Sequence, residues 1–198
     1  MTIIYLVRHG TTDLVGKMLC GTTPGISLND EGRRQASKTA QYLAQLTIKA
    51  LFCSPIQRAV ETADIIGHQL GLTAVQKEFL SEINFGDLQG TDAFLLRALP
   101  FWQQFIQDPS DVTFPNGDSV VAVQERASAG LASLAAQFEE QEEIVCVAQG
   151  EVILLAIADF IGLPLREMHH LTIDTACITR LEWFGDRKKL RYHNLRTY

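Results

Sequence analysis

Three short apolar runs, separated by longer helical patterns, most constrain how this chain can fold. The runs occupy residues 2–8, 49–53 and 143–148. Each is too short for a typical helix and is apolar at its central positions, as expected of parallel strands that are covered on both faces. The sequence therefore predicts an α/β fold with a mostly parallel sheet.

Helical periodicity fills the intervals between these runs. Apolar side chains recur every three or four residues after Ser54 and again after Ser119, and the segment after Gln149 is apolar nearly all round. Ser54 is the expected N-cap of its helix, with Pro55 at the first helical position. The expected helices span about residues 31–46, 55–70, 119–140 and 151–161.

The end of the chain has the pattern of a hairpin. Residues 177–184 and 190–193 are the two expected strands, joined through Gly185-Asp186. With 198 residues, 46% of them hydrophobic, the chain is long enough to bury one ordinary core. We therefore expect a single three-layer domain over residues 1–198, with helices on both faces of the sheet.

Charge and hydropathy exclude several classes of partner. The net charge is −6, and the one basic tract is Arg187-Lys188-Lys189, which argues against nucleic acid or a membrane surface as partner. The apolar start lacks a basic region and is interrupted by Arg8 and His9, unlike a signal peptide. The apolar stretch 152–163 is too short to span a bilayer. We expect a cytoplasmic protein.

The cysteines and paired histidines do not predict a metal site. The four cysteines lie far apart and form no C-x-x-C pair, so we expect reduced, buried thiols. His169-His170 resembles a metal pair, but adjacent side chains converge poorly on one ion, which favours a loop or strand-edge role. We expect neither a metal nor a cofactor. The cysteines are Cys20, Cys53, Cys146 and Cys177.

Polar residues stand directly after each of the three predicted strands. These are Arg8-His9-Gly10, Ser54-Pro55 and Gln149-Gly150. In open α/β sheets, ligands bind outside the carboxyl ends of the strands. The sequence therefore predicts one pocket built from segments that lie far apart in the chain.

The residue types at these ends suit phosphoryl transfer. A neutral imidazole such as His9 can attack phosphorus and form a phosphohistidine, while arginines neutralise the phosphoryl charge. Arg8 is adjacent, and Arg58 lies one turn into the following helix; its alternative role is a surface ion pair with Glu61 or Glu31.

An acid must also protonate the leaving alcohol. Glu82 is the candidate, and its alternative role is a solvated loop carboxylate. A nearby phosphate dianion would favour the protonated form of this side chain, which is the form that an acid catalyst requires.

Taken together, the motifs resemble the small phosphatase branch of the histidine phosphatase superfamily, also called phosphoglycerate mutase-like. The matching segments, in the family's order, are residues 6–12, 28–36, 53–63, 82–90 and 115–119. The resemblance implies that His9 accepts the phosphoryl group, that Arg8 and Arg58 clamp it, and that Glu82 donates the proton. We also expect Thr12, Thr22, Gln149 and Gly150 to contact the substrate.

Two positions depart from the family pattern. Gln149 stands where the family has its second catalytic histidine, and Val15 stands in place of an asparagine. A glutamine amide can donate a hydrogen bond but carries no positive charge. Loss of an oxyanion donor typically costs about 100- to 1000-fold in turnover. We therefore expect phosphate binding to persist and turnover to be reduced.

Three functions follow from this pattern. The first is a phosphomonoesterase that acts on a small phosphorylated metabolite through a phosphohistidine at His9. The second is a catalytically weak or inactive protein that binds phosphate esters. A phosphoglycerate mutase is less favoured, because Arg97 is the one basic residue between Ile83 and Glu125. The aromatic stretch within residues 94–105 is either a substrate lid or ordinary helix packing, and the sequence leaves the oligomeric state open.

Overall fold

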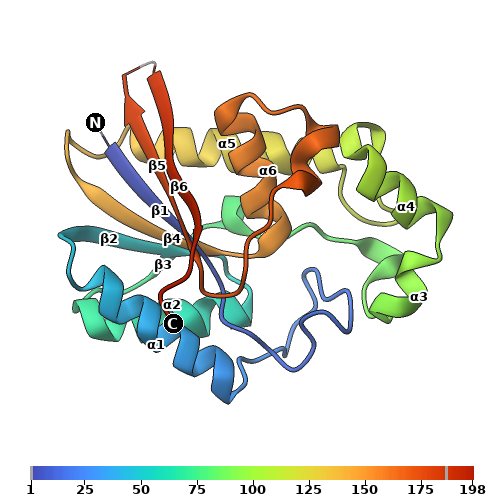
Figure 1. Cartoon of the computed structure of the whole chain (residues 1–198), viewed down its shortest axis with the longest axis horizontal. Helices are drawn as coiled ribbons and strands as arrows, with labels where there is room; N and C mark the ends of the chain where they lie inside the picture. Colours follow the sequence, from blue (N-terminus) through green and yellow to red (C-terminus); the bar gives the residue numbers. More distant parts are fainter. Residues whose placement is uncertain (1, 186) are drawn as a thin grey trace.

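A mixed six-stranded sheet divides the molecule, with helices on both faces (Figure 1). The computed structural model describes residues 2–185 and 187–198. The strand order is β3-β2-β4-β1-β5-β6, with parallel pairing from β3 to β1 and antiparallel pairing of β5 and β6. The predicted mostly parallel α/β sheet is confirmed. The strands are β1 (Thr2–Arg8), β2 (Ile48–Cys53), β3 (Val75–Gln76), β4 (Glu143–Ala148), β5 (Ile178–Phe184) and β6 (Arg187–Leu195).

Two pairs of helices cover the two faces of the sheet. Helices α1 and α2 pack together on one face, and α5 and α6 pack together on the other. The short helices α3 and α4 lie to one side, beyond the carboxyl end of β1 (Figure 1). The helices are α1 (Asp30–Leu43), α2 (Gln57–Leu70), α3 (Ala93–Arg97), α4 (Pro100–Gln107), α5 (Val120–Ala135) and α6 (Gly150–Ile161).

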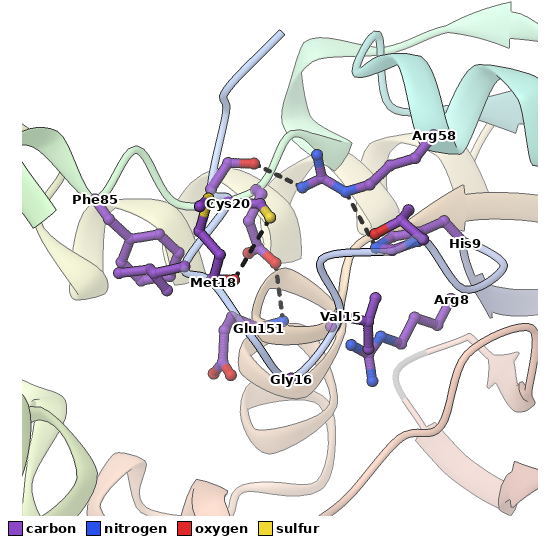
Figure 2. A pocket seen from close by; sticks show the side chains of 14 residues that line it. Arg8, His9, Val15, Gly16, Met18, Cys20, Arg58, Phe85 and Glu151 are labelled. Carbon is purple, nitrogen blue, oxygen red and sulfur yellow. Dashed lines mark hydrogen bonds between the residues drawn. The ribbon is translucent and has the colours of Figure 1, made fainter. Parts of the chain in front are cut away.

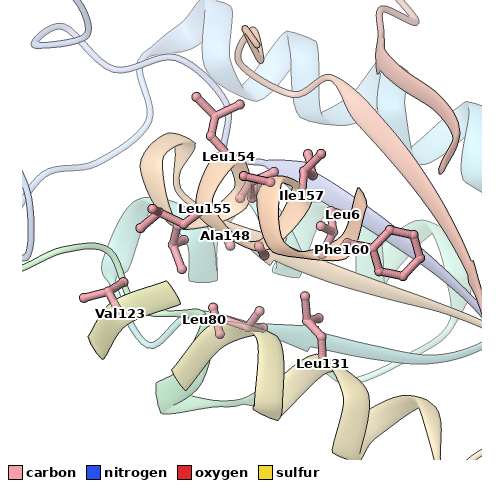
Figure 3. Packing of buried hydrophobic residues seen from close by; sticks show 14 of the residues in the cluster. Leu6, Leu80, Val123, Leu131, Ala148, Leu154, Leu155, Ile157 and Phe160 are labelled. Carbon is pink, nitrogen blue, oxygen red and sulfur yellow. The ribbon is translucent and has the colours of Figure 1, made fainter. Parts of the chain in front are cut away.

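Strand β1 shows why the first run is apolar throughout. Ile4 and Leu6 belong to the core cluster under α5 and α6, whereas Tyr5 and Val7 belong to the cluster under α1 and α2. Figure 3 shows Leu6 in the first of these clusters, between the side chains of the two helices. Because successive side chains of a strand point to opposite faces, a strand covered on both sides has no position for a polar residue.

The start of α2 differs from the prediction. Ser54 is not its N-cap and Pro55 is not helical, because the helix begins at Gln57 after Ile56. The Ser54 N–H continues the strand by donating to Val147 O at 2.9 Å. Pairing with β4 therefore keeps Ser54 extended and delays the helix by two residues.

The other boundaries shift by a few residues. Helix α1 begins one residue early, because the Asn29 side chain accepts the Gly32 N–H at 2.9 Å and so caps it. Both α1 and α5 end earlier than predicted, and β6 is longer than residues 190–193. Of the predicted turn, Asp186 lies outside the described residues.

The cysteines are free thiols, as predicted, and all except the partly exposed Cys20 are buried. Across residues 2–185 and 187–198, no helix is both long enough and apolar enough to cross a membrane. The same residues contain no group of three or more histidine, cysteine or acidic side chains arranged to hold a metal ion.

Candidate active site

A pocket opens at the carboxyl ends of β1 and β4, as the sequence predicted. Figure 2 shows Arg8, His9 and Arg58 along one wall, with Phe85 and Met18 across from them. Segments that are far apart in the chain supply the walls. The lining residues are Arg8, His9, Thr12, Val15, Gly16, Met18, Leu19, Cys20, Gly21, Arg58, Glu82, Phe85, Gly150 and Glu151.

His9 is buried at the end of β1, and one of its ring nitrogens is hydrogen-bonded to the backbone. Its Nδ1 lies 2.7 Å from Gly10 O, so this nitrogen carries the proton that the carbonyl accepts. Its Nε2 accepts a hydrogen bond from Arg58 Nε at 3.2 Å. Burial, and then the positive charges of Arg58 and Arg8, hold the pKa of His9 well below its usual value. The ring is therefore neutral, with a lone pair on Nε2.

Arg58 lies in the first turn of α2 and is buried, so the alternative of a surface ion pair with Glu61 or Glu31 is wrong. Its Nη2 donates to Gly21 O at 2.6 Å, and its Nε donates to His9. Its Nη1 is buried and has no hydrogen-bond partner among the described residues. A buried guanidinium with an unpaired donor at a pocket wall is suited to hold an anion.

Arg8 supplies a second unpaired donor. Its Nη1 donates to Ile173 O at 2.6 Å, which fixes the guanidinium, while its Nε is buried without a partner among the described residues. A Cβ atom at Gly150 would lie 3.2 Å from this Nε, so the glycine lets the guanidinium pack close to the start of α6. Arg8 and Arg58 thus each offer one N–H to an anion in the pocket.

Glu82 is 6% exposed and lies at the N-terminus of α6, so it is not a solvated loop carboxylate. Its Oε1 accepts the N–H groups of Ile83 and Val152 at 3.0 Å, and its Oε2 accepts that of Glu151 at 3.2 Å. Burial, and then the charge of Glu151, raise the pKa of Glu82 to about 7. These effects outweigh the backbone hydrogen bonds and the nearby Arg58, which lower it.

Gln149 lies behind the pocket wall, at the N-cap position of α6, and is 1% exposed. Its Nε2 donates to Ser54 Oγ at 3.1 Å, and its Oε1 is buried without a partner among the described residues. The sequence predicted that the amide nitrogen contacts the substrate, but here it donates to Ser54. The next two residues, Gly150 and Glu151, line the pocket in its place.

The two predicted threonines have different positions. Thr12 is buried and lines the pocket. Thr22 lies outside this cavity, with its N–H and its hydroxyl both donating to Gln89 Oε1, at 2.6 and 2.9 Å. Sequence reasoning missed Glu151 as a pocket residue, although it placed Glu151 in a helix. It also missed most of the loop that crosses the pocket, residues 15–21, because this loop has no periodic signal.

Of the two roles that the sequence allowed, the structure shows helix packing for part of the aromatic stretch. Phe94 and Leu95 in α3 are 81% and 60% exposed, so they do not pack in the core. Trp102 and Phe105 in α4 pack against each other with ring centroids 5.0 Å apart. Phe105 also contacts the ring of His169. The expected loop or strand-edge position of His169-His170 is wrong, because both residues lie in a 3-10 helix, Leu165–His170.

Comparison with known proteins connects this geometry to a family. Residues 4–196 match the family model of the Histidine phosphatase superfamily (branch 1). The uncharacterized phosphatase PhoE of Bacillus subtilis is 27% identical over 198 residues, which cover 100% of this chain and 97% of that protein.

Solved structures give the same result. YhfR of Bacillus stearothermophilus superposes with a TM-score of 0.91 at 26% identity, with 98% of each chain covered. A mycobacterial glucosyl-3-phosphoglycerate phosphatase, solved with VO3, superposes with a TM-score of 0.88 at 28% identity, again with 98% of each chain covered. PhoE and the mycobacterial protein are both named as phosphatases.

Proposed function

Because the chain belongs to the histidine phosphatase superfamily, we propose that it is a phosphomonoesterase that carries the phosphoryl group on His9 Nε2. One observation carries the proposal: a neutral, buried imidazole presents its Nε2 lone pair between two arginines, each with one N–H that has no partner among the described residues. This arrangement provides a nucleophile and a site for the phosphoryl charge in the same place.

In the first step, His9 Nε2 attacks phosphorus and the bond from phosphorus to the alcohol oxygen breaks. The electron pair goes to that oxygen, which takes a proton from Glu82. Arg58 Nε, which donates to Nε2 in the free protein, donates to a phosphoryl oxygen instead. The ring becomes positively charged, and Gly10 O stabilises that charge through the Nδ1 proton.

In the second step, water attacks the phosphorus of the phosphohistidine. The Glu82 carboxylate formed in the first step removes a proton from that water, and the bond between phosphorus and Nε2 breaks. Phosphate leaves, and His9 returns to its neutral form. A carboxyl group with a pKa of about 7 suits both tasks, because an efficient acid–base catalyst titrates near the working pH.

We propose that Gln149 makes this cycle slow. By resemblance, the family's second catalytic histidine falls at this position, where a protonated imidazole would add positive charge beside the phosphoryl oxygens. An amide adds none, and here its nitrogen donates to Ser54 rather than to the pocket. The phosphate site retains both arginines, so binding depends less on Gln149 than turnover does.

The same residue favours the second candidate function, a protein that binds phosphate esters without efficient hydrolysis. A mutase is less favoured, because Arg8 and Arg58 are the only basic side chains among the pocket residues that the structure describes. The anionic leaving group of a phosphoglycerate would find no further cation there.

The test is hydrolysis of p-nitrophenyl phosphate by the parent protein, His9→Ala and Gln149→His, with phosphohistidine measured by mass spectrometry. We expect slow hydrolysis by the parent with phosphate on His9, and none by His9→Ala. Equal activity in these two proteins, without phosphoprotein, would overturn the hydrolase proposal. Phosphate binding without phosphoprotein, even in Gln149→His, would favour the binding protein.

A further inference from the structure

The outer part of the pocket is apolar on one side and acidic on the other. Val15, Met18, Leu19 and Phe85 supply the apolar side. Both pocket arginines are fixed at the inner end by hydrogen bonds to His9 and to backbone carbonyls. The pocket therefore concentrates its positive charge on the phosphate site and offers none to the alcohol portion of a substrate.

Glu151 supplies the acidic side. It follows Gly150 in the first turn of α6, and in Figure 2 its carboxylate points away from His9 and Arg58. Its Oε2 is buried and has no hydrogen-bond partner within the described residues. This Oε2 lies 3.5 Å from His169 Nε2, which makes an ion pair when the imidazole is protonated and is longer than an ordinary hydrogen bond.

The surroundings of His169 hold this carboxylate in place. The imidazole stacks edge-on against Phe105 with a centroid separation of 5.0 Å, and its Nδ1 lies 3.2 Å from Ile106 O. Oε2 is buried on the His169 side, so the 29% of the Glu151 side chain that is exposed belongs to its other atoms, and through these the residue lines the pocket. Glu151 is thus a carboxylate at the pocket wall whose Oε2 side is held by its approach to His169.

The path of the alcohol follows from the position of Glu82. With the phosphoryl group between the arginines and His9, the alcohol oxygen lies at Glu82, which protonates it. The Glu82 carboxylate is itself hydrogen-bonded to the peptide N–H of Glu151 at 3.2 Å. A substituent two or three bonds beyond the alcohol oxygen therefore passes the side chain of Glu151.

We propose that Glu151 determines specificity by selecting phosphomonoesters whose alcohol carries an ammonium group and by disfavouring those that carry a carboxylate. This inference rests on the phosphate site proposed above. The methylene groups of an amino alcohol pack against Met18 and Phe85, and an ammonium near the Phe85 ring gains a cation–π attraction. A carboxylate in the same place meets a like charge.

The expected discrimination is moderate. Partly exposed ion pairs change affinity severalfold, and the attraction of one substituent adds to the repulsion of the other. We therefore expect about a 10-fold difference in Kd between ammonium and carboxylate ligands, with a neutral ligand between them.

The experiment uses three phosphonates of similar size that cannot be hydrolysed. These are 2-aminoethylphosphonate, propylphosphonate and 2-carboxyethylphosphonate, titrated calorimetrically into the intact protein at one pH. We expect the parent to bind them in that order of affinity and Glu151→Gln to bind all three with similar Kd. The control Glu125→Gln removes the same charge from an exposed position on α5 and is expected to keep the parent's ratios.

Equal binding of the three ligands by the parent would overturn the proposal. So would tighter binding of the carboxylate ligand, an unchanged ratio in Glu151→Gln, or binding of inorganic phosphate with no binding of any phosphonate. Because binding of phosphonates requires no turnover, failure of the hydrolase proposal is separate. A protein that forms no phosphohistidine but binds the ligands in the expected order would fail as an enzyme and still support the role of Glu151.

Discussion

Strands β1 and β4 lie side by side in parallel, with Arg8 opposite Ala148, and each ends in a polar residue. His9, after β1, has its Nδ1 fixed by Gly10 and its Nε2 facing the pocket. Gln149, after β4, has its nitrogen fixed by Ser54, and its oxygen is buried without a partner in the part of the chain that the structure describes. Two strand ends with the same topology thus differ because hydrogen bonds direct one reactive atom toward the ligand and hold the other side chain away.

The largest expected effect tests this asymmetry directly. His9→Ala removes the nucleophile, so we expect hydrolysis of p-nitrophenyl phosphate to fall by at least about 1000-fold and phosphohistidine to disappear. Gln149→Ala removes a side chain that does not line the pocket, so we expect less than about a 10-fold change. The measurement is kcat/KM for both variants. Similar losses in the two would show that the strand ends are functionally equivalent.

Glu82 accepts N–H groups from the helix that follows Gln149 and lines the same pocket as His9. We expect Glu82→Gln to lower kcat/KM for an alkyl phosphate by about 100-fold or more, because this quantity reports the first step, in which the alcohol must be protonated as it leaves. p-Nitrophenolate leaves without a proton, so its ester is expected to lose much less. A loss of the same size for both esters would contradict the role of Glu82 as an acid.

The same carboxyl group is expected to make kcat/KM depend on pH. The pKa of Glu82 is raised to about 7, and the acid form is present below that value. The kcat/KM for an alkyl phosphate is therefore expected to fall as the pH rises through about 7 in the parent. Glu82→Gln, measured over the same range, is expected to lack this decrease.

Gln149→His makes the two strand ends chemically alike. We expect turnover to rise by about 100-fold, because a protonated imidazole supplies the positive charge that the amide lacks. The KM is expected to change less, since both arginines remain. The measurement is single-turnover formation and decay of phosphohistidine. An unchanged rate would mean that Gln149 does not limit the reaction.

A smaller effect is expected on the free energy of unfolding, through Glu82 at the start of α6. The pKa of Glu82 is raised from 4.5 to about 7 by folding, so its contribution to stability is complete below pH 4.5 and is lost as the pH rises through about 7. The loss corresponds to on the order of 3 kcal/mol. Urea unfolding at several pH values is expected to show this loss in the parent, and a flatter profile in Glu82→Gln than in Glu125→Gln.

The sequence predicted the parts of the molecule that local patterns determine. Strands β1 and β4 are buried on both faces, which leaves an apolar run that is visible in the sequence. His9 and Arg58 follow strand ends, and the fold brings such ends together. The predicted start of α2 was wrong, because Ser54 is hydrogen-bonded to Val147 and Gln149, which are distant in the chain.

The loop over the pocket was missed for a similar reason. Its position depends on backbone hydrogen bonds from a distant segment. Gly90 N donates to Leu19 O at 2.9 Å, and Ala93 N donates to Lys17 O at 2.8 Å. Such hydrogen bonds produce no periodic pattern of apolar residues in the sequence. Glu151 was missed because its neighbour Gln149 occupied the expected catalytic position, whereas the N-cap geometry turns Glu151 toward the pocket.

The smallest expected effect concerns the hydrogen bond from Gln149 to Ser54, which holds the amide away from the pocket. Ser54 Oγ accepts from Gln149 Nε2 at 3.1 Å and from the Ile56 N–H at 3.3 Å, so Ser54→Ala leaves two donors without an acceptor. We expect a loss of about 1–2 kcal/mol in the free energy of unfolding. In a double-mutant cycle with Gln149→Ala, measured by urea unfolding, the coupling energy is expected to be about 1 kcal/mol. A coupling of zero would mean that Ser54 does not hold Gln149, and the contrast with His9 would then rest on side-chain chemistry alone.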